Sequence, residues 1–151
     1  LDIWGSADAF HYVWQPVSGD VDVIARVASV EYVHAWVKAG VMIREQLTAG
    51  SAHGLMLVSA GKGIAFQRRT STGGIATHTS GGAGTAPHWV KLERRGNVLT
   101  AYRSADGVAW TLVGSDTLVL PVDVYVGLAV SSHVDNRLAT ATFDNVSVIP
   151  R

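Results

Sequence analysis

The sequence contains no cysteine, so neither a disulfide nor a thiolate metal site can support its fold. No run of apolar residues approaches the ~18 that a helix needs to cross a membrane. Neither charge predominates, because 12 Lys and Arg residues balance 12 Asp and Glu residues. Proteins that neutralise nucleic-acid phosphates normally carry a basic excess. We therefore expect no membrane insertion and no nucleic-acid partner.

Helical periodicity is absent as well, and apolar residues alternate with polar ones instead, which is typical of β-strands. About ten such segments follow one another, which favours an antiparallel all-β sandwich or barrel. Turn residues at 61–63, 96–97 and 106–107 predict three hairpins. The alternating segments cover residues 10–15, 21–27, 36–45, 53–60, 64–70, 88–94, 98–104, 110–115, 122–131 and 138–149. A chain of 151 residues fits one domain of this kind.

Glycine, serine and threonine dominate residues 71–87, with almost nothing to pack. We expect a long loop there, which is either a flexible hairpin tip or a ligand-gripping loop.

The segment Ser104–Trp110 resembles the Asp-box turn of sialidases. In such a turn Asp106 accepts backbone N–H groups, Gly107 takes a positive φ and Trp110 covers the hairpin.

Residues 36–45 predict a strand with two unlike faces, because successive side chains point to opposite sides. One face is plain core: Val37, Ala39, Val41 and Ile43. The other combines an aromatic ring, two cations and a methionine, which indicates either a solvated surface or a platform for sugars, which stack on aromatic rings. The proposed platform consists of Trp36, Lys38, Arg44, His53, Gln67 and Arg69.

Trp36 is the tryptophan that we expect to be most exposed. Trp89 reads as outward-facing, whereas Trp4, Trp14 and Trp110 have the pattern of core or turn-covering residues.

Catalytic patterns are sparse. The three glutamates stand far apart, whereas a retaining glycosidase needs two carboxyl groups about 5 Å apart. The six histidines occur singly, without the spacing of a zinc site. We therefore predict no catalytic residue and no required cofactor.

Seven segments together resemble a concanavalin A-like/laminin-G-like jelly-roll family, named for the yeast regulator of enolase. The segments are Asp2–Pro16, Lys38–Glu45, Gly63–Thr70, Trp89–Arg94, Ser104–Trp110, Tyr125–Val130 and Ala141–Val148. The resemblance covers essentially the whole chain and implies a two-sheet jelly-roll sandwich. It also implies a secreted or cell-surface bacterial setting, with neighbouring domains such as glycoside hydrolases in the same parent protein.

Members of that family carry a further N-terminal strand pair. By this resemblance, residues 1–151 are one β-sandwich module excised from a larger protein, and the sheet edge beside 143–149 is exposed. The resemblance also implies a structural Ca²⁺ at Asp144, which would need six to eight oxygen ligands.

The expected function is non-catalytic binding of a carbohydrate or surface glycan. The alternatives are a structural or protein-interaction module that binds no sugar and, third, an accessory or catalytic domain of a glycan-active enzyme.

Overall fold

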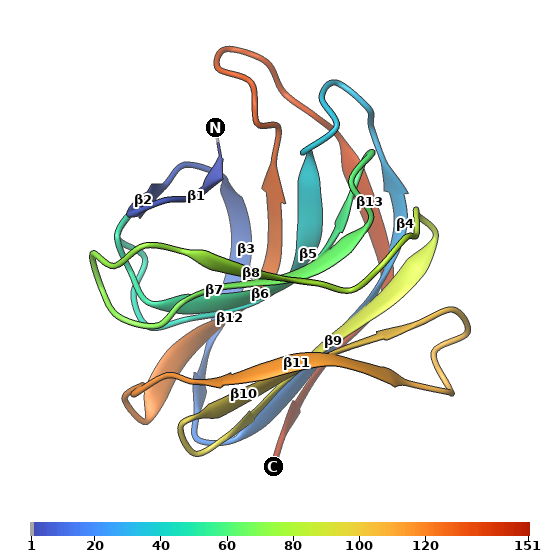
Figure 1. The fold of residues 1–151 in the computed structure, drawn as a ribbon. Helices are drawn as coiled ribbons and strands as arrows, with labels where there is room; N and C mark the ends of the chain where they lie inside the picture. The colour runs from blue at the N-terminus through green and yellow to red at the C-terminus, as the bar shows by residue number, and fades with distance from the viewer. Residues whose placement is uncertain (1) are drawn as a thin grey trace.

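The computed structural model describes residues 2–151, and within that range it consists of strands and turns without a helix (Figure 1). The all-β prediction is therefore confirmed. No described residue belongs to a helix that is long and apolar enough to span a membrane. In chain order the strands are β1 (Ile3–Trp4), β2 (Ala7–Asp8), β3 (His11–Ser18), β4 (Val21–Val30), β5 (Lys38–Arg44), β6 (His53–Ser59), β7 (Ile64–Arg69), β8 (Thr77–Ser80), β9 (His88–Arg95), β10 (Val98–Ser104), β11 (Thr111–Thr117), β12 (Asp123–Ser131) and β13 (Ala141–Pro150).

The strands form two antiparallel sheets that pack face to face, with a small third sheet on the outside (Figure 1). The six-stranded sheet has the order β3-β12-β5-β6-β7-β8, and the five-stranded sheet has the order β11-β10-β9-β4-β13. Among the described residues β1 pairs with β2 alone, and this short hairpin lies over the six-stranded sheet. The predicted jelly-roll sandwich is thereby confirmed.

Alternating side chains from both sheets fill the space between them. On β5 the inward residues Ala39, Val41 and Ile43 have no exposed surface, and they pack in one cluster with Val23 and Leu92 of the opposite sheet. Burying one such aliphatic side chain contributes about 1.5–3 kcal/mol. The core face predicted for this strand is therefore correct.

The turn of Ser104–Trp110 has the predicted geometry. Asp106 Oδ1 accepts the backbone N–H groups of Val108 at 2.8 Å and Ala109 at 3.0 Å. Gly107 has a φ of 78°, and a Cβ there would lie 2.7 Å from the Trp89 ring. Trp110 meets Trp89 edge-on, with 6.5 Å between ring centroids, so the two indoles cover the hairpin together.

Residues 2–151 form 13 strands rather than about ten, and the three unpredicted ones are β1, β2 and β8. β8 lies inside residues 71–87, so the expectation of a long loop there is wrong in part. Its threonines, Thr77 and Thr79, favour extended backbone, and β8 pairs with β7 as the sixth strand of its sheet.

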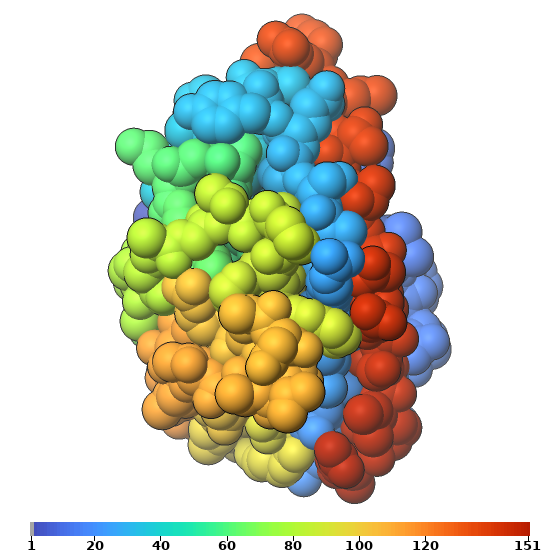
Figure 2. Space-filling view, turned by 90° about the vertical axis from the view of Figure 1, so that its right-hand side faces the viewer, coloured from blue at the N-terminus to red at the C-terminus, as the bar shows by residue number. Residues whose placement is uncertain are grey.

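β13 is the edge strand of the five-stranded sheet, and within the described residues it pairs on one side only, with β4. Figure 2 shows β13 as a red band at the surface beside the blue β4. The edge position expected for residues 143–149 is observed.

Candidate functional site

The predicted platform residues of β5, β6 and β7 share the outer face of the six-stranded sheet. Strand register places Arg44, His53 and Arg69 side by side in one row across β5, β6 and β7. Two residues along each strand, a second row holds Met42, Leu55 and Gln67, and it continues to His78 on β8. Lys38 begins β5 further along the same face, and Trp36 precedes it by two residues.

This outer face is covered by residues 2–10, the N-terminal segment, and is not the open platform that we expected. Gly5, with a φ of 55°, turns the chain tightly between β1 and β2. Ile3 and Asp8 are directly opposed in this hairpin, so both side chains point toward the sheet. Ile3 packs into a second apolar cluster with Met42 and Leu55.

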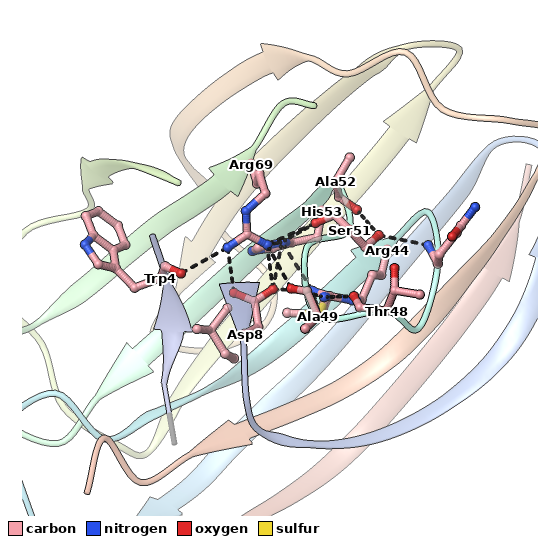
Figure 3. Close-up of polar contacts among 12 residues, drawn as sticks. Trp4, Asp8, Arg44, Thr48, Ala49, Ser51, Ala52, His53 and Arg69 are labelled. Carbon is pink, nitrogen blue, oxygen red and sulfur yellow. Dashed lines mark hydrogen bonds and ion pairs between the residues drawn. The ribbon is translucent and has the colours of Figure 1, made fainter. Parts of the chain in front are cut away.

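Asp8 lies against the row formed by Arg44, His53 and Arg69. We call these four side chains the arginine cluster (Figure 3). Its Oδ2 accepts hydrogen bonds from Arg44 Nη1 and Arg69 Nη1, each at 2.7 Å, and its Oδ1 accepts one from Arg69 Nη2 at 2.8 Å. The side chains of Asp8 and Arg69 have no exposed surface, and that of Arg44 is 1% exposed. The cluster therefore fastens the N-terminal segment to the sheet.

The remaining guanidinium N–H groups of the cluster mostly donate to backbone carbonyls. Arg69 Nη2 donates to the carbonyl oxygens of Trp4 at 3.0 Å and Gly5 at 2.9 Å, and Arg44 Nη2 to that of Thr48 at 2.6 Å. Three separate stretches of chain, around residues 4–5, 48–51 and 74, are held by these two arginines. We infer a structural role, because both guanidinium groups are buried and bound to Asp8 and backbone carbonyls; Arg44 Nε, which has no partner among the described residues, is buried as well.

The electrostatics of the cluster follow from its burial. Burial alone would raise the pKa of Asp8, but hydrogen bonds from Arg69 and Arg44, and the charge that His53 takes up in acid, outweigh that effect and hold the pKa below its usual value. Burial lowers the pKa of His53 to about 4, and both arginines act in the same direction, against Asp8. At neutral pH the cluster holds one carboxylate, two guanidinium cations and a neutral imidazole.

Beside the N-terminal segment lies a cleft of about 340 Å³, which we name the tryptophan cleft. Its volume is at the low end of the range for small-molecule sites. The side chains that line it come from the N-terminal segment, from strands β5, β7 and β8, and from the segments just before β5 and just after β12. They are Asp2, Trp4, Trp36, Lys38, Gln67, His78 and His133.

Aromatic rings surround the ammonium group of Lys38 in this cleft. Its Nζ lies 5.4 Å from the centroid of the Trp4 ring and 5.6 Å from that of Trp36. The His78 ring meets both indoles edge-on, with centroid distances of 6.5 Å to Trp4 and 5.8 Å to Trp36. The arrangement offers apolar ring surface next to a positive charge.

The polar groups of the cleft are largely paired with one another. Lys38 Nζ donates to Asp2 Oδ1 and to the carbonyl oxygen of Ile3, each at 2.9 Å. Asp2 Oδ2 lies 3.1 Å from His133 Nδ1, and the His133 ring stacks on His34 at 4.3 Å. Burial lowers the pKa of Lys38, although Asp2 counteracts this.

The six predicted site residues thus divide into two groups. Trp36, Lys38 and Gln67 line the tryptophan cleft. Arg44, His53 and Arg69 belong to the buried arginine cluster and do not line it, which contradicts their placement on an exposed platform. The reason is Asp8, which covers them from the N-terminal segment.

Four lining residues were missed in the sequence: Asp2, Trp4, His78 and His133. Trp4 and Trp14 were expected to be core or turn-covering residues, but they are 41% and 44% exposed. Trp36 is half-buried and less exposed than either of them, so the expectation that it is the most exposed tryptophan is wrong. Trp89 is half-buried as well. Of the four missed lining residues, only His78 could have been predicted from the sequence. If residues 77–80 are recognised as a strand, His78 lies directly opposite Gln67.

Asp144 makes an ion pair with Arg26 at 2.7 Å, on the exposed face of the five-stranded sheet. Residues 2–151 contain no group of three or more His, Asp or Glu side chains that could hold a metal ion. The described carboxylates therefore do not assemble a calcium site around Asp144, and calcium binding there stays a prediction of the resemblance.

Solved structures of other proteins share this fold. A functionally unknown protein from Saccharomyces cerevisiae aligns with a TM-score of 0.76 at 19% identity, covering 99% of this chain and 83% of that one. The carbohydrate binding module CBM66 from Bacillus subtilis aligns with a TM-score of 0.64 at 14% identity, covering 99% of both chains.

A xylan beta-1,4-xylosidase from Bacillus halodurans C-125 aligns with a TM-score of 0.73 at 16% identity and covers 97% of this chain, which spans only 32% of that enzyme. No family model and no curated protein matches the chain. These similarities show a concanavalin A-like jelly-roll fold and nothing about the ligand.

Proposed function

We propose that the protein is a non-catalytic carbohydrate-binding module and that the tryptophan cleft is its sugar site. The observation that carries the proposal is the convergence of Trp4 and Trp36, which lie far apart in the sequence, on one cleft with Lys38 and Gln67. Sugars stack their C–H faces on aromatic rings, while amide and ammonium groups hydrogen-bond their hydroxyls. The cleft supplies both kinds of contact.

The carboxylates argue for binding rather than hydrolysis. Asp2 is the one carboxylate among the described residues that line the cleft, and it is engaged by Lys38 and His133. Glycoside hydrolysis requires a pair of carboxyl groups, one on each side of the scissile bond. The similarity to part of a xylosidase favours, as the second candidate, an accessory domain of a glycan-active enzyme.

The setting of the module follows from the resemblance of its sequence to the family named for the yeast regulator of enolase. On that basis the module belongs to a secreted or cell-surface bacterial protein and works beside neighbouring domains. The xylosidase, of which a comparable fold is one part, is consistent with such an arrangement.

A glycan array followed by calorimetric titration of the sugars that bind tests the proposal. Trp36→Ala should weaken binding about 5- to 150-fold, because loss of an aromatic stacking partner costs roughly 1–3 kcal/mol, by analogy with base stacking. Trp14→Ala is the matched control. Trp14 is also a partly exposed tryptophan on the outer face of the same sheet, but register places it four strands from Gln67, roughly 19 Å.

Both variants must keep the melting temperature of the wild type, so that lost binding does not merely report lost folding. Equal affinities of Trp36→Ala and the wild type would refute the cleft as the site. Absence of binding to any sugar of a broad array would favour the structural-module alternative instead.

A further inference from the structure

The amide oxygen of Gln67 is a buried polar atom of the tryptophan cleft that has neither a hydrogen bond nor an ion pair within the described residues. His133 Nδ1 also lacks a hydrogen bond, but it lies 3.1 Å from Asp2 Oδ2. Gln67 is 2% exposed, and its Oε1 makes no hydrogen bond within residues 2–151. A buried carbonyl oxygen without a donor is costly, and a ligand that donates a hydrogen bond would remove this cost. A hydroxyl group can donate that bond, whereas an ionised carboxylate or sulfate only accepts.

The charges in the cleft are already balanced. The ammonium group of Lys38 is neutralised by Asp2 at 2.9 Å. Partial burial and the charges of Lys38 and Arg68 lower the pKa of His78, so its imidazole is neutral at pH 7. An anionic sugar would therefore have to compete with Asp2 for the one lysine, with no net positive charge to attract it.

The arginines that could bind an acidic sugar are occupied elsewhere. Arg44 and Arg69 are buried against Asp8, and neither lines the cleft. Arg68 donates from its Nε to Asp116 at 2.9 Å and does not line the cleft either. Bidentate recognition of a uronate or sulfate by arginine, which is the strong form of such contacts, is not available in this cleft.

From these observations, and resting on the proposed function, we infer that the tryptophan cleft selects uncharged sugars. One hydroxyl of the bound sugar donates a hydrogen bond to Gln67 Oε1, and the C–H face of the ring stacks on tryptophan. Uronate and sulfated sugars are excluded, because their anionic group would be repelled by Asp2 and would find no free cation in the cleft, whatever hydroxyl they present to Gln67. Gln67 is thus a specificity-determining residue.

The test is a titration of the wild type with two sets of probes. The neutral set contains xylo-, cello-, manno- and fructo-oligosaccharides, and the acidic set contains oligogalacturonate, oligoglucuronate and a sulfated oligosaccharide of equal length. Binding should be confined to the neutral set, and the affinity should change less than about twofold between roughly 0.05 and 0.5 M salt. Preference for the acidic set, with affinity that falls as salt rises, would overturn the inference.

Gln67→Met tests the role of the amide, because methionine fills a similar volume without an acceptor oxygen. Affinity for the neutral sugar should fall about 2- to 12-fold, as expected for one hydrogen bond. Gln15→Met, at an exposed position on β3, should leave affinity unchanged. If Gln67→Met lowers the melting temperature, Gln67→Asn is used as the test variant instead. It keeps an amide but withdraws it by one methylene.

Failure of this inference can be separated from failure of the proposed function. If Trp36→Ala loses binding while Gln67→Met does not, the cleft is the sugar site, but Gln67 does not determine which sugar binds. If neither variant changes the affinity of a sugar that the wild type binds, the proposed site is wrong, and the inference is wrong with it.

Discussion

Removal of the negative charge of Asp8 should destabilise the protein more than any other single carboxylate-to-amide change. Asp8→Asn keeps the shape of the side chain but leaves Arg44 and Arg69 buried with no counter-charge among the residues that contact them. Loss of one partner of a buried ion pair typically costs about 3–5 kcal/mol.

The contacts of the two arginines indicate that the loss of stability for Asp8→Asn lies near the lower end of that range. Both guanidinium groups keep hydrogen bonds to backbone carbonyls, such as those of Thr48 and Gly5, after the charge is removed. The asparagine also retains one oxygen that can accept from Arg69. We therefore expect a loss of about 3 kcal/mol for Asp8→Asn and a larger loss for Asp8→Ala, which also leaves a cavity.

Urea denaturation at neutral pH measures the effect, with Asp144→Asn as the control. Asp144 pairs with Arg26 at the same 2.7 Å, but the two side chains are 48% and 33% exposed, so its loss should cost at most about 1 kcal/mol. The difference in free energy of unfolding between Asp8→Asn and the wild type should also vanish in acid. The pKa of Asp8 is lowered in the folded state, so its contribution is present above about pH 4 and disappears as pH falls through the folded pKa. Equal losses for the two variants at neutral pH would refute the role of the cluster.

Two further predictions concern His53 and Gly107. Folded His53 has a pKa of about 4 and the unfolded residue about 6.5, so only the unfolded chain takes up a proton between these values. The free energy of unfolding should therefore fall by about 3 kcal/mol as pH drops from 6.5 to 4. His53→Gln should remove that pH dependence. The same pH dependence in His53→Gln and the wild type would contradict the prediction. Gly107→Ala should cost about 1–3 kcal/mol more in thermal or urea unfolding than Gly96→Ala, because both have positive φ but only Gly107 faces a ring, that of Trp89. Equal costs would show that the ring moves aside.

The sequence predicted the long strands and their faces because a period of two is a local property. Val41 and Ile43 could be assigned to the core, and Lys38 and Arg44 to the opposite face, from alternation alone. The hairpins at residues 61–63 and 96–97 were equally local, since glycine marks their turns.

The missed residues lie in elements too short to show a period. β1 and β2 have two residues each and β8 has four, yet they supply Trp4, Asp8 and His78. Pairing of Asp8 with Arg69, 61 positions away, depends on how the N-terminal segment folds back over the sheet. No local pattern distinguishes Asp8 from the other aspartates, so exposure of the arginine row could not be judged from the sequence.

The tryptophan side chains provide the most direct test of the central claim, that the tryptophan cleft binds sugar. The five indole N–H signals in a ¹H–¹⁵N correlation spectrum, assigned by single Trp→Phe variants, are followed during titration with a neutral oligosaccharide that binds. The signals of Trp4 and Trp36 should shift in a saturable manner, while those of Trp14, Trp89 and Trp110 stay in place. Saturable shifts of Trp89 and Trp110, on the opposite sheet, with Trp4 and Trp36 unmoved would contradict the account.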